Sequence, residues 1–221
     1  MKPYRFLHII SVLYITFQLV SDATAGKLID VFGFPVSITV LYFPLTFVIA
    51  DVLTEVYGYA QARRVIWQVL LASVLAALVY QVVVLLPPAD GFDANDSYLK
   101  IFGSAPRMVL GGWIAVWAGG NLNNFILAKM KLWTNGKYLW TRTIGSAIVG
   151  ELANTALFYT IALSGILPAD VLTQSILTGW MIKVGVEIIL TPLTYWVVGT
   201  LKRLEQEDYY DRDTDFNPLI V

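Results

Sequence analysis

The segment VIWQVLLASVLAALVYQVVVLL, residues 65–86, contains no charged side chain. About 20 apolar residues in a helix are needed to cross the ~30 Å hydrocarbon core of a bilayer. Four further apolar stretches of similar length occupy residues 4–23, 107–128, 142–163 and 171–200, and a shorter one at residues 38–55 is interrupted by Pro44. We therefore predict an all-α membrane protein with six transmembrane helices.

The composition agrees with this prediction and excludes several classes of function. Apolar residues make up 57% of the chain and charged residues only 14%, whereas a soluble domain carries roughly a quarter charged residues. The net charge of −1 offers no basic surface for nucleic acid. The chain has no cysteine and a single histidine, which excludes disulfides, thiolate chemistry and multi-histidine metal sites. We expect neither a metal nor a cofactor.

Basic residues lie unevenly between the predicted spans, and Lys and Arg accumulate on the cytoplasmic side of membrane proteins. With the N-terminus inside, eleven basic residues are cytoplasmic, three are external and Lys183 lies within the sixth span. We therefore expect both termini to be cytoplasmic. The first span resembles a signal peptide with a small-residue motif at 23–25, but its length and Gln18 favour a spanning helix.

The same pattern divides the chain into parts. Residues 1–204 form a transmembrane domain, and residues 205–221 form an acidic cytoplasmic tail that we expect to be solvated or partly ordered. The external segment 87–96, which contains three aspartates, is expected to be a solvated loop.

Ionisable side chains inside the predicted spans are the first functional candidates. Each costs about 2.5–3.5 kcal/mol at the bilayer centre on insertion scales, so it needs a partner or a task. Asp51 and Glu55 are four positions apart and share one helical face near the cytoplasmic end of the second span. They are either clamped by Arg63 and Arg64, or form a gate that pairs with these arginines in one conformation only.

The fifth and sixth spans carry three more such residues. Lys183 and Glu187 are four positions apart and have opposite charges, so one interpretation is an ion pair within the helix. Glu151 has no opposite charge within a turn of its own helix. It is therefore protonated, paired with Lys183 across helices, or in contact with a polar ligand. Asn154 lies on nearly the same helical face, and Ser146 lies at its edge.

The fourth span contains a row of small residues, Gly111, Ala115 and Gly119, at four-residue spacing. Such rows let helices approach closely, either within one chain or in a homodimer. Near them lie three carboxamides that need a polar partner, Asn121, Asn123 and Asn124.

Two deep tryptophans complete the set of candidates. Trp117 and Trp180 lie about ten residues, or ~15 Å, from a span end, where an indole either packs in the core or forms a stacking wall. Carboxylates, carboxamides and aromatic faces together suit a polar planar solute. A guanine-like edge, with its adjacent N1–H and amino donors, suits bidentate contact with a carboxylate.

Four motifs resemble those of one known family. They are ADVLTEVYGYAQARRVIW at 50–67, IFGSAPRMVLG at 101–111, RTIGSAIVGELANTALF at 142–158 and TDFNPL at 214–219. The chain resembles the queuosine precursor transporter family, also called vitamin-uptake-transporter-like, over nearly its whole length. The resemblance implies six spans, uptake of 7-cyano- and 7-aminomethyl-7-deazaguanine, and a fold similar to the substrate-binding component of energy-coupling-factor transporters, without their ATPases.

The resemblance also implies functional positions. It places Asp51, Glu55, Tyr57, Arg63 and Arg64 in the first motif, Arg142, Ser146 and Gly150 in the third, and it includes Asn123. Family members often have Gln at the position of Glu151, Asp at that of Asn154 and an acid at that of Gly120. In this chain the carboxylate and the carboxamide of the fifth span are therefore exchanged, one helical turn apart.

We therefore predict a multi-pass transporter of the bacterial or archaeal cytoplasmic membrane that imports a deazapurine. The predicted substrate-binding residues are Glu151, Asn154, Asn123, Ser146, Trp117, Trp180, Lys183 and Glu187, and the predicted gating or coupling residues are Asp51, Glu55, Arg63, Arg64 and Arg142. Glu151 and Glu187 are the candidates for proton coupling. The alternatives are a binding subunit that needs a separate ATPase, an intramembrane enzyme and a lipid-embedded assembly factor.

Overall fold

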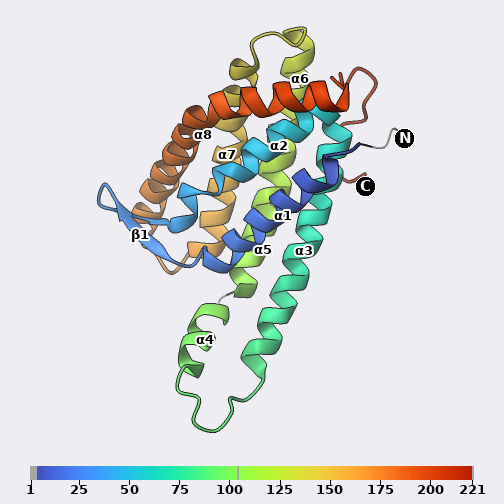
Figure 1. Ribbon diagram of the computed structural model, residues 1–221. Helices are drawn as coiled ribbons and strands as arrows, with labels where there is room; N and C mark the ends of the chain where they lie inside the picture. The colour runs from blue at the N-terminus through green and yellow to red at the C-terminus, as the bar shows by residue number, and fades with distance from the viewer. Residues whose placement is uncertain (1–3, 104, 221) are drawn as a thin grey trace.

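The computed structural model describes residues 4–103 and 105–220 as a bundle of helices with one short hairpin (Figure 1). The helices are α1 (Leu7–Thr24), α2 (Pro44–Tyr57), α3 (Tyr59–Leu85), α4 (Asn95–Phe102), α5 (Ala105–Ala115), α6 (Asn121–Trp133), α7 (Leu139–Leu163) and α8 (Ala169–Glu205). A 3₁₀ turn, η1 (Ile38–Leu41), precedes α2, and a π-helical turn, η2 (Val116–Gly120), joins α5 to α6.

Within the described residues, four helices are long and apolar enough to cross a membrane: α1, α3, α7 and α8. The other two predicted spans are less regular. The helix of the second span is only 14 residues long and begins at Pro44. Proline fits the first turn of a helix because its missing N–H has no intrahelical partner there. Pro44 therefore starts this helix. The prediction that Pro44 interrupts the second span is wrong.

The fourth predicted span is divided by the π-helical turn η2. A π turn inserts one residue into the hydrogen-bonding pattern and frequently lies at a functional site. Here it lies between α5 and α6 and contains Trp117 and Gly119. No pattern in the sequence indicated this turn.

Two further elements were not predicted, so the chain is mostly helical instead of all-α. The strands β1 (Leu28–Val31) and β2 (Phe34–Ser37) form an antiparallel hairpin. Its two-residue turn, Phe32 and Gly33, has positive φ at both positions, as a tight hairpin requires. Helix α4 begins within the segment expected to be a solvated loop.

The two chain ends lie side by side at one end of the bundle (Figure 1). The backbone N–H groups of Arg5 and Phe6 donate to the carboxylate of Glu205, at 3.0 and 2.7 Å. We call this end of the bundle the terminal end. The opposite end carries the hairpin, where the N–H of Ser37 donates to the Tyr159 hydroxyl of α7 at 3.0 Å, and we call it the hairpin end.

The row of small residues brings the fourth predicted span against α7. A Cβ built on Gly119 would lie 2.7 Å from both the Asn154 Cβ and the Gly150 oxygen, and a Cβ on Gly150 would lie 2.7 Å from the Asn123 Cβ. The prediction of close helix approach is confirmed, and in this chain the contact is intramolecular. It also fixes Asn123 and Asn154 at the helix crossing.

This crossing generates a prediction for glycine substitutions. We expect Gly119→Ala to lower the free energy of unfolding by about 1–3 kcal/mol, because its methyl group has no room. Gly199→Ala is the matched control, since Gly199 also lies within a helix but a Cβ there meets nothing within 4 Å. Thermal melts of purified protein, followed by tryptophan fluorescence, measure both. Equal melting temperatures for the two variants would refute the crossing.

Candidate functional site

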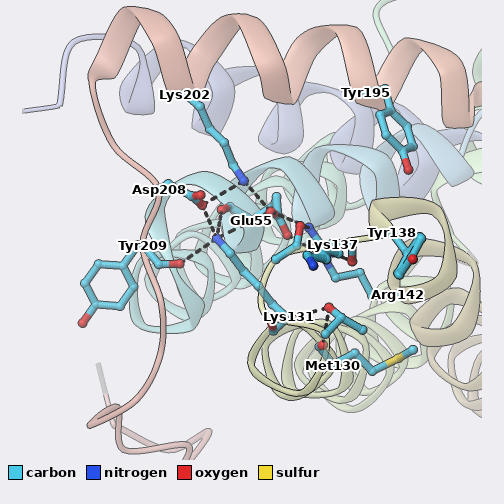
Figure 2. Close-up of polar contacts among 12 residues, drawn as sticks. Glu55, Met130, Lys131, Lys137, Tyr138, Arg142, Tyr195, Lys202, Asp208 and Tyr209 are labelled. Atoms are coloured by element: carbon cyan, nitrogen blue, oxygen red, sulfur yellow. Dashed lines mark hydrogen bonds and ion pairs between the residues drawn. The ribbon is translucent and has the colours of Figure 1, made fainter.

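At the terminal end, the carboxylate of Glu55 on α2 is surrounded by three cations (Figure 2). Arg142 of α7 donates to both of its oxygens, from Nε at 2.9 Å and from Nη2 at 2.8 Å. Lys202 of α8 lies 2.5 Å and Lys131 of α6 lies 3.5 Å from Oε1. Glu55 is fully buried, so the bidentate arginine and the two ammonium groups replace the water it loses.

The C-terminal tail adds a second acid to this group. Asp208 lies 2.6 Å from Lys131 and 2.8 Å from Lys202. Partial burial by itself would raise the pKa of Asp208, but the hydrogen bonds from the two lysines outweigh it and hold that pKa below its usual range. We call Glu55, Lys131, Arg142, Lys202 and Asp208 the terminal ion cluster. It joins α2, α6, α7, α8 and the tail.

Arg63 does not belong to this cluster. Its Nη1 donates to the carbonyls of Asp215 and Asn217, at 2.8 and 2.7 Å, and Trp67 Nε1 donates to the carbonyl of Pro218 at 3.1 Å. The tail is thus ordered and packed against α3. The alternative in which Arg63 clamps Glu55 is wrong, because Arg63 binds the tail and the ionic partners of Glu55 are the three cations of the cluster.

Deeper in the bundle, Lys183 of α8 contacts two residues of α7. Its Nζ lies 3.1 Å from Glu151 Oε2 and 2.9 Å from Asn154 Oδ1, and 4.3 Å from the centre of the Phe43 ring. The alternative that pairs Glu151 with Lys183 across helices is confirmed. The predicted ion pair between Lys183 and Glu187 within α8 is wrong, because Lys183 turns toward α7.

Glu187 instead faces Asp51 of α2. Asn123 of α6 donates to Asp51 Oδ1 at 2.7 Å, and the carboxyl group of Glu187 lies close to that of Asp51. Neither Asp51 Oδ2 nor either oxygen of Glu187 has a donor. Two carboxyl groups can form a hydrogen bond with each other only when one of them carries a proton.

The residues around Lys183 and those around Asp51 together form the central polar cluster. We define it as Asp51, Asn123, Glu151, Asn154, Lys183 and Glu187. Each of its residues is buried. Several of its polar atoms have no partner in the structure, among them Glu151 Oε1, Asn123 Oδ1 and Asn154 Nδ2. Such atoms are rare in folded proteins and call for a water, an ion or a ligand.

Three of the predicted substrate-binding residues lie outside this cluster. The Ser146 hydroxyl is buried and donates within its own helix, to the Thr143 carbonyl at 3.0 Å. Trp180 Nε1 donates to the Ile148 carbonyl of α7 at 3.0 Å. Trp117 packs partly against the core, and its ring borders a surface groove beside the tail. Neither tryptophan lines the cavity described next.

A narrow central cavity lies beside the cluster, with Asn154 and Lys183 in its wall. Its volume, about 20 Å³, holds roughly one water molecule. The aromatic residues of its wall are Phe43 and Phe158. Glu151 does not line the cavity, but it contacts Lys183, which does.

The wall of the cavity also contains two residues that the sequence analysis missed as site residues, Gln18 and Asp22 of α1. Gln18 Nε2 donates to Asp22 Oδ1 at 2.8 Å, and the Ser73 hydroxyl of α3 donates to Asp22 Oδ2 at 2.6 Å. Two polar residues four positions apart in an apolar helix were the available signal. Gln18 served in the sequence analysis only as an argument against a signal peptide.

No group of three or more His, Asp or Glu residues within the described chain is arranged to hold a metal ion. The residues of the central polar cluster can supply hydrogen bonds, charge pairing and proton exchange by buried carboxyl groups.

Comparison with known proteins gives a family and two relatives. The family model described as putative vitamin uptake transporter matches residues 37–197. A probable queuosine precursor transporter of Bacillus subtilis (strain 168) is 30% identical over 170 residues, which are 76% of this chain and 74% of that protein. One of Haemophilus influenzae (strain Rd) is 24% identical over 152 residues, 67% of this chain and 60% of that protein. No solved structure matches significantly.

The terminal ion cluster predicts a pH-dependent contribution of the tail to stability. At pH 7, Asp208→Asn is expected to lower the free energy of unfolding by up to about 1 kcal/mol, because Asp208 is partly exposed. Its folded-state pKa lies below the ordinary value, so this contribution is fully present above about pH 4 and is lost as the pH falls through the lower folded-state pKa. Thermal melts between pH 3 and 7 measure the difference between wild type and variant.

The exposed Asp213 of the same tail provides the control. Asp213→Asn is expected to melt like the wild type across this range. If Asp208→Asn behaved in the same way, the tail would contribute nothing to the cluster.

Proposed function

This chain belongs to the putative vitamin uptake transporter family, and from that premise we propose that it imports a queuosine precursor across the cytoplasmic membrane. The resemblance noted in its motifs is confirmed. The family consists of transporters, not enzymes, so the chain is a multi-pass membrane transporter and the alternative of an intramembrane enzyme falls away.

The proposed substrates are 7-cyano- and 7-aminomethyl-7-deazaguanine. Both curated relatives are named probable queuosine precursor transporters. The observation that carries the proposal for this chain is the set of buried polar atoms without a partner in the middle of the bundle. A polar heterocycle with donors and acceptors on its edge supplies the hydrogen bonds that these atoms lack.

We propose six spans with both termini in the cytoplasm, in a fold similar to the substrate-binding component of energy-coupling-factor transporters. The four long helices account for spans one, three, five and six. Helix α2 and the continuous run α5–η2–α6 pack within the bundle and account for the second and fourth spans. The adjacent chain ends support an even number of crossings. The terminal ion cluster gathers basic residues at the same end, which agrees with a cytoplasmic face.

Two layers along the transport path have different roles in this proposal. The terminal ion cluster, with Glu55 and Arg142 at its centre, is the closed cytoplasmic gate. The central polar cluster binds the substrate. Because Glu151 does not line the cavity, we propose that it acts by holding Lys183 in place, while Lys183 and Asn154 contact the substrate.

The test of substrate class is rescue of cells that can neither make nor import deazaguanines. We expect the chain to restore queuosine in tRNA when either base is supplied. Glu151→Gln should abolish rescue, because it leaves the buried Lys183 without a counter-charge. Asp170→Asn is the control, since Asp170 is exposed in the first turn of α8. Absence of rescue by the wild-type chain with both bases, although it is inserted, would refute the proposal.

The proximity of the Asp51 and Glu187 carboxyl groups leads us to propose that protons drive uptake through this pair. Asn123 donates to Asp51, and the other charged groups that act on the pair are Glu151, Glu55 and Arg142. In proteoliposomes, an inward proton gradient should drive accumulation, and Glu187→Gln should leave exchange intact but remove the response to the gradient. Asp170→Asn should respond like the wild type. Uptake that ignores the gradient would eliminate this coupling.

Reconstitution also separates the transporter from its main alternative, a binding subunit of an energy-coupling-factor transporter. A complete transporter moves the base across the membrane as a pure chain. A binding subunit would bind the base but would not move it without an ATPase partner.

A further inference from the structure

The α1 pair, Gln18 and Asp22, has the properties of a ligand-binding site that neither the family motifs nor the predicted site residues include. Both side chains line the central cavity. Gln18 is 2% and Asp22 is 7% exposed. The hydrogen bonds from Gln18 Nε2 and the Ser73 hydroxyl fix the Asp22 carboxylate, at 2.8 and 2.6 Å. A carboxylate held in this way is preorganised, and each of its oxygens keeps a lone pair for a further donor.

The two walls of the cavity present complementary unpaired atoms. On α1, Gln18 Oε1 is a buried acceptor without a donor. On α7, Asn154 Nδ2 is a buried donor without an acceptor, and Asn154 is 2% exposed. Lys183 lies beside it. The α1 wall therefore accepts hydrogen bonds, whereas the α7–α8 wall donates them.

Asp22 also connects two cavities. Besides the central one, it lines a larger groove of about 480 Å³ toward the hairpin end, together with Lys27, Lys100 and Met108. The groove has room for a purine-sized base, whereas the central cavity of about 20 Å³ has not. A base that reaches the centre from this groove passes Asp22, and the walls of the central cavity must separate to admit it.

Gly112 of α5 keeps the approach to this carboxylate open. A Cβ built there would lie 3.2 Å from Asp22 Oδ1. Even a methyl group at this position would therefore press against the carboxylate.

We infer that Asp22 and Gln18 form the acceptor half of a binding site for a lactam edge, meaning a ring carbonyl next to N–H and amino donors. The ligand directs its N–H and amino groups to Asp22 and Gln18 Oε1. Its ring carbonyl accepts from Asn154 Nδ2 and Lys183, and Phe43 and Phe158 cover the ring faces. This assignment rests on the proposed function, and it names the residues that would select guanine-type over adenine-type bases.

A cation fits the same space less well. Lys183 already supplies a positive charge to this cavity, and the orphaned Asn154 Nδ2 is a donor. Both features repel a metal ion, and both suit a carbonyl oxygen.

The test compares two probes on the purified full-length chain: 7-cyano-7-deazaguanine and the same base without its 2-amino group. We expect the wild type to bind the second probe on the order of ten- to a hundredfold more weakly, as for the loss of a hydrogen bond to a charged group. Asp22→Asn should bind the first probe at least tenfold more weakly and should discriminate much less between the two. Asp93→Asn, an exposed loop residue, is the control and should match the wild type.

A second variant guards against a folding defect. Gln18→Met keeps the length of the side chain and removes both Oε1 and the Nε2 donor to Asp22, whose other hydrogen bond, from Ser73, remains. It should weaken binding of the first probe while thermal melts remain near those of the wild type. If the wild type binds the base and both variants retain its affinity and its discrimination, the α1 site is refuted while the proposed function stands. If the wild type binds neither probe, the proposed function and this inference both fall.

Discussion

The structure depends on the requirement that a carboxylate removed from water must meet positive charge. Glu55 meets it with three cations from α6, α7 and α8. Breaking a buried pair of this kind costs several kcal/mol, because the remaining charges stay buried. Since each partner comes from a different helix, the same contact that neutralises Glu55 also fixes the spacing of four helices. If one of these helices moves and opens this end of the bundle, ion pairs of the cluster must separate. The cluster is therefore suited to act as a gate.

The sequence was sufficient for the features that follow from composition and period. Long apolar runs predicted the four spanning helices α1, α3, α7 and α8, and glycine spacing predicted the close crossing at Gly119. The sequence was insufficient for contacts between residues that are distant in the chain. Glu55 selects Arg142, 87 positions away, over the nearby Arg63. The hairpin and the π turn depend on packing around them, and neither has a periodic signature.

The prediction of the candidate site succeeded for burial and failed for the choice of partners. Lone charges within spans correctly marked Asp51, Glu151, Lys183 and Glu187 as buried residues that need partners. Helical spacing suggested that Lys183 pairs with Glu187, whereas the close approach of α7 gives Lys183 to Glu151. The α1 pair was overlooked because Asp22 lies near a helix end, where an acid is unremarkable in sequence. Only its contacts with Gln18 and Ser73 reveal how deeply it is enclosed.

The long separation of Glu55 from its partners has a consequence for biosynthesis. Lys131, Arg142 and Lys202 follow it by 76, 87 and 147 positions. A nascent chain therefore delivers α2 to the translocon well before any of these cations has been made. Until then, the carboxylate must remain hydrated at the membrane surface or be shielded by the insertion machinery. We therefore expect the second helix to reach its final depth only once its partners on α6, α7 and α8 are in place, which is not the order of synthesis.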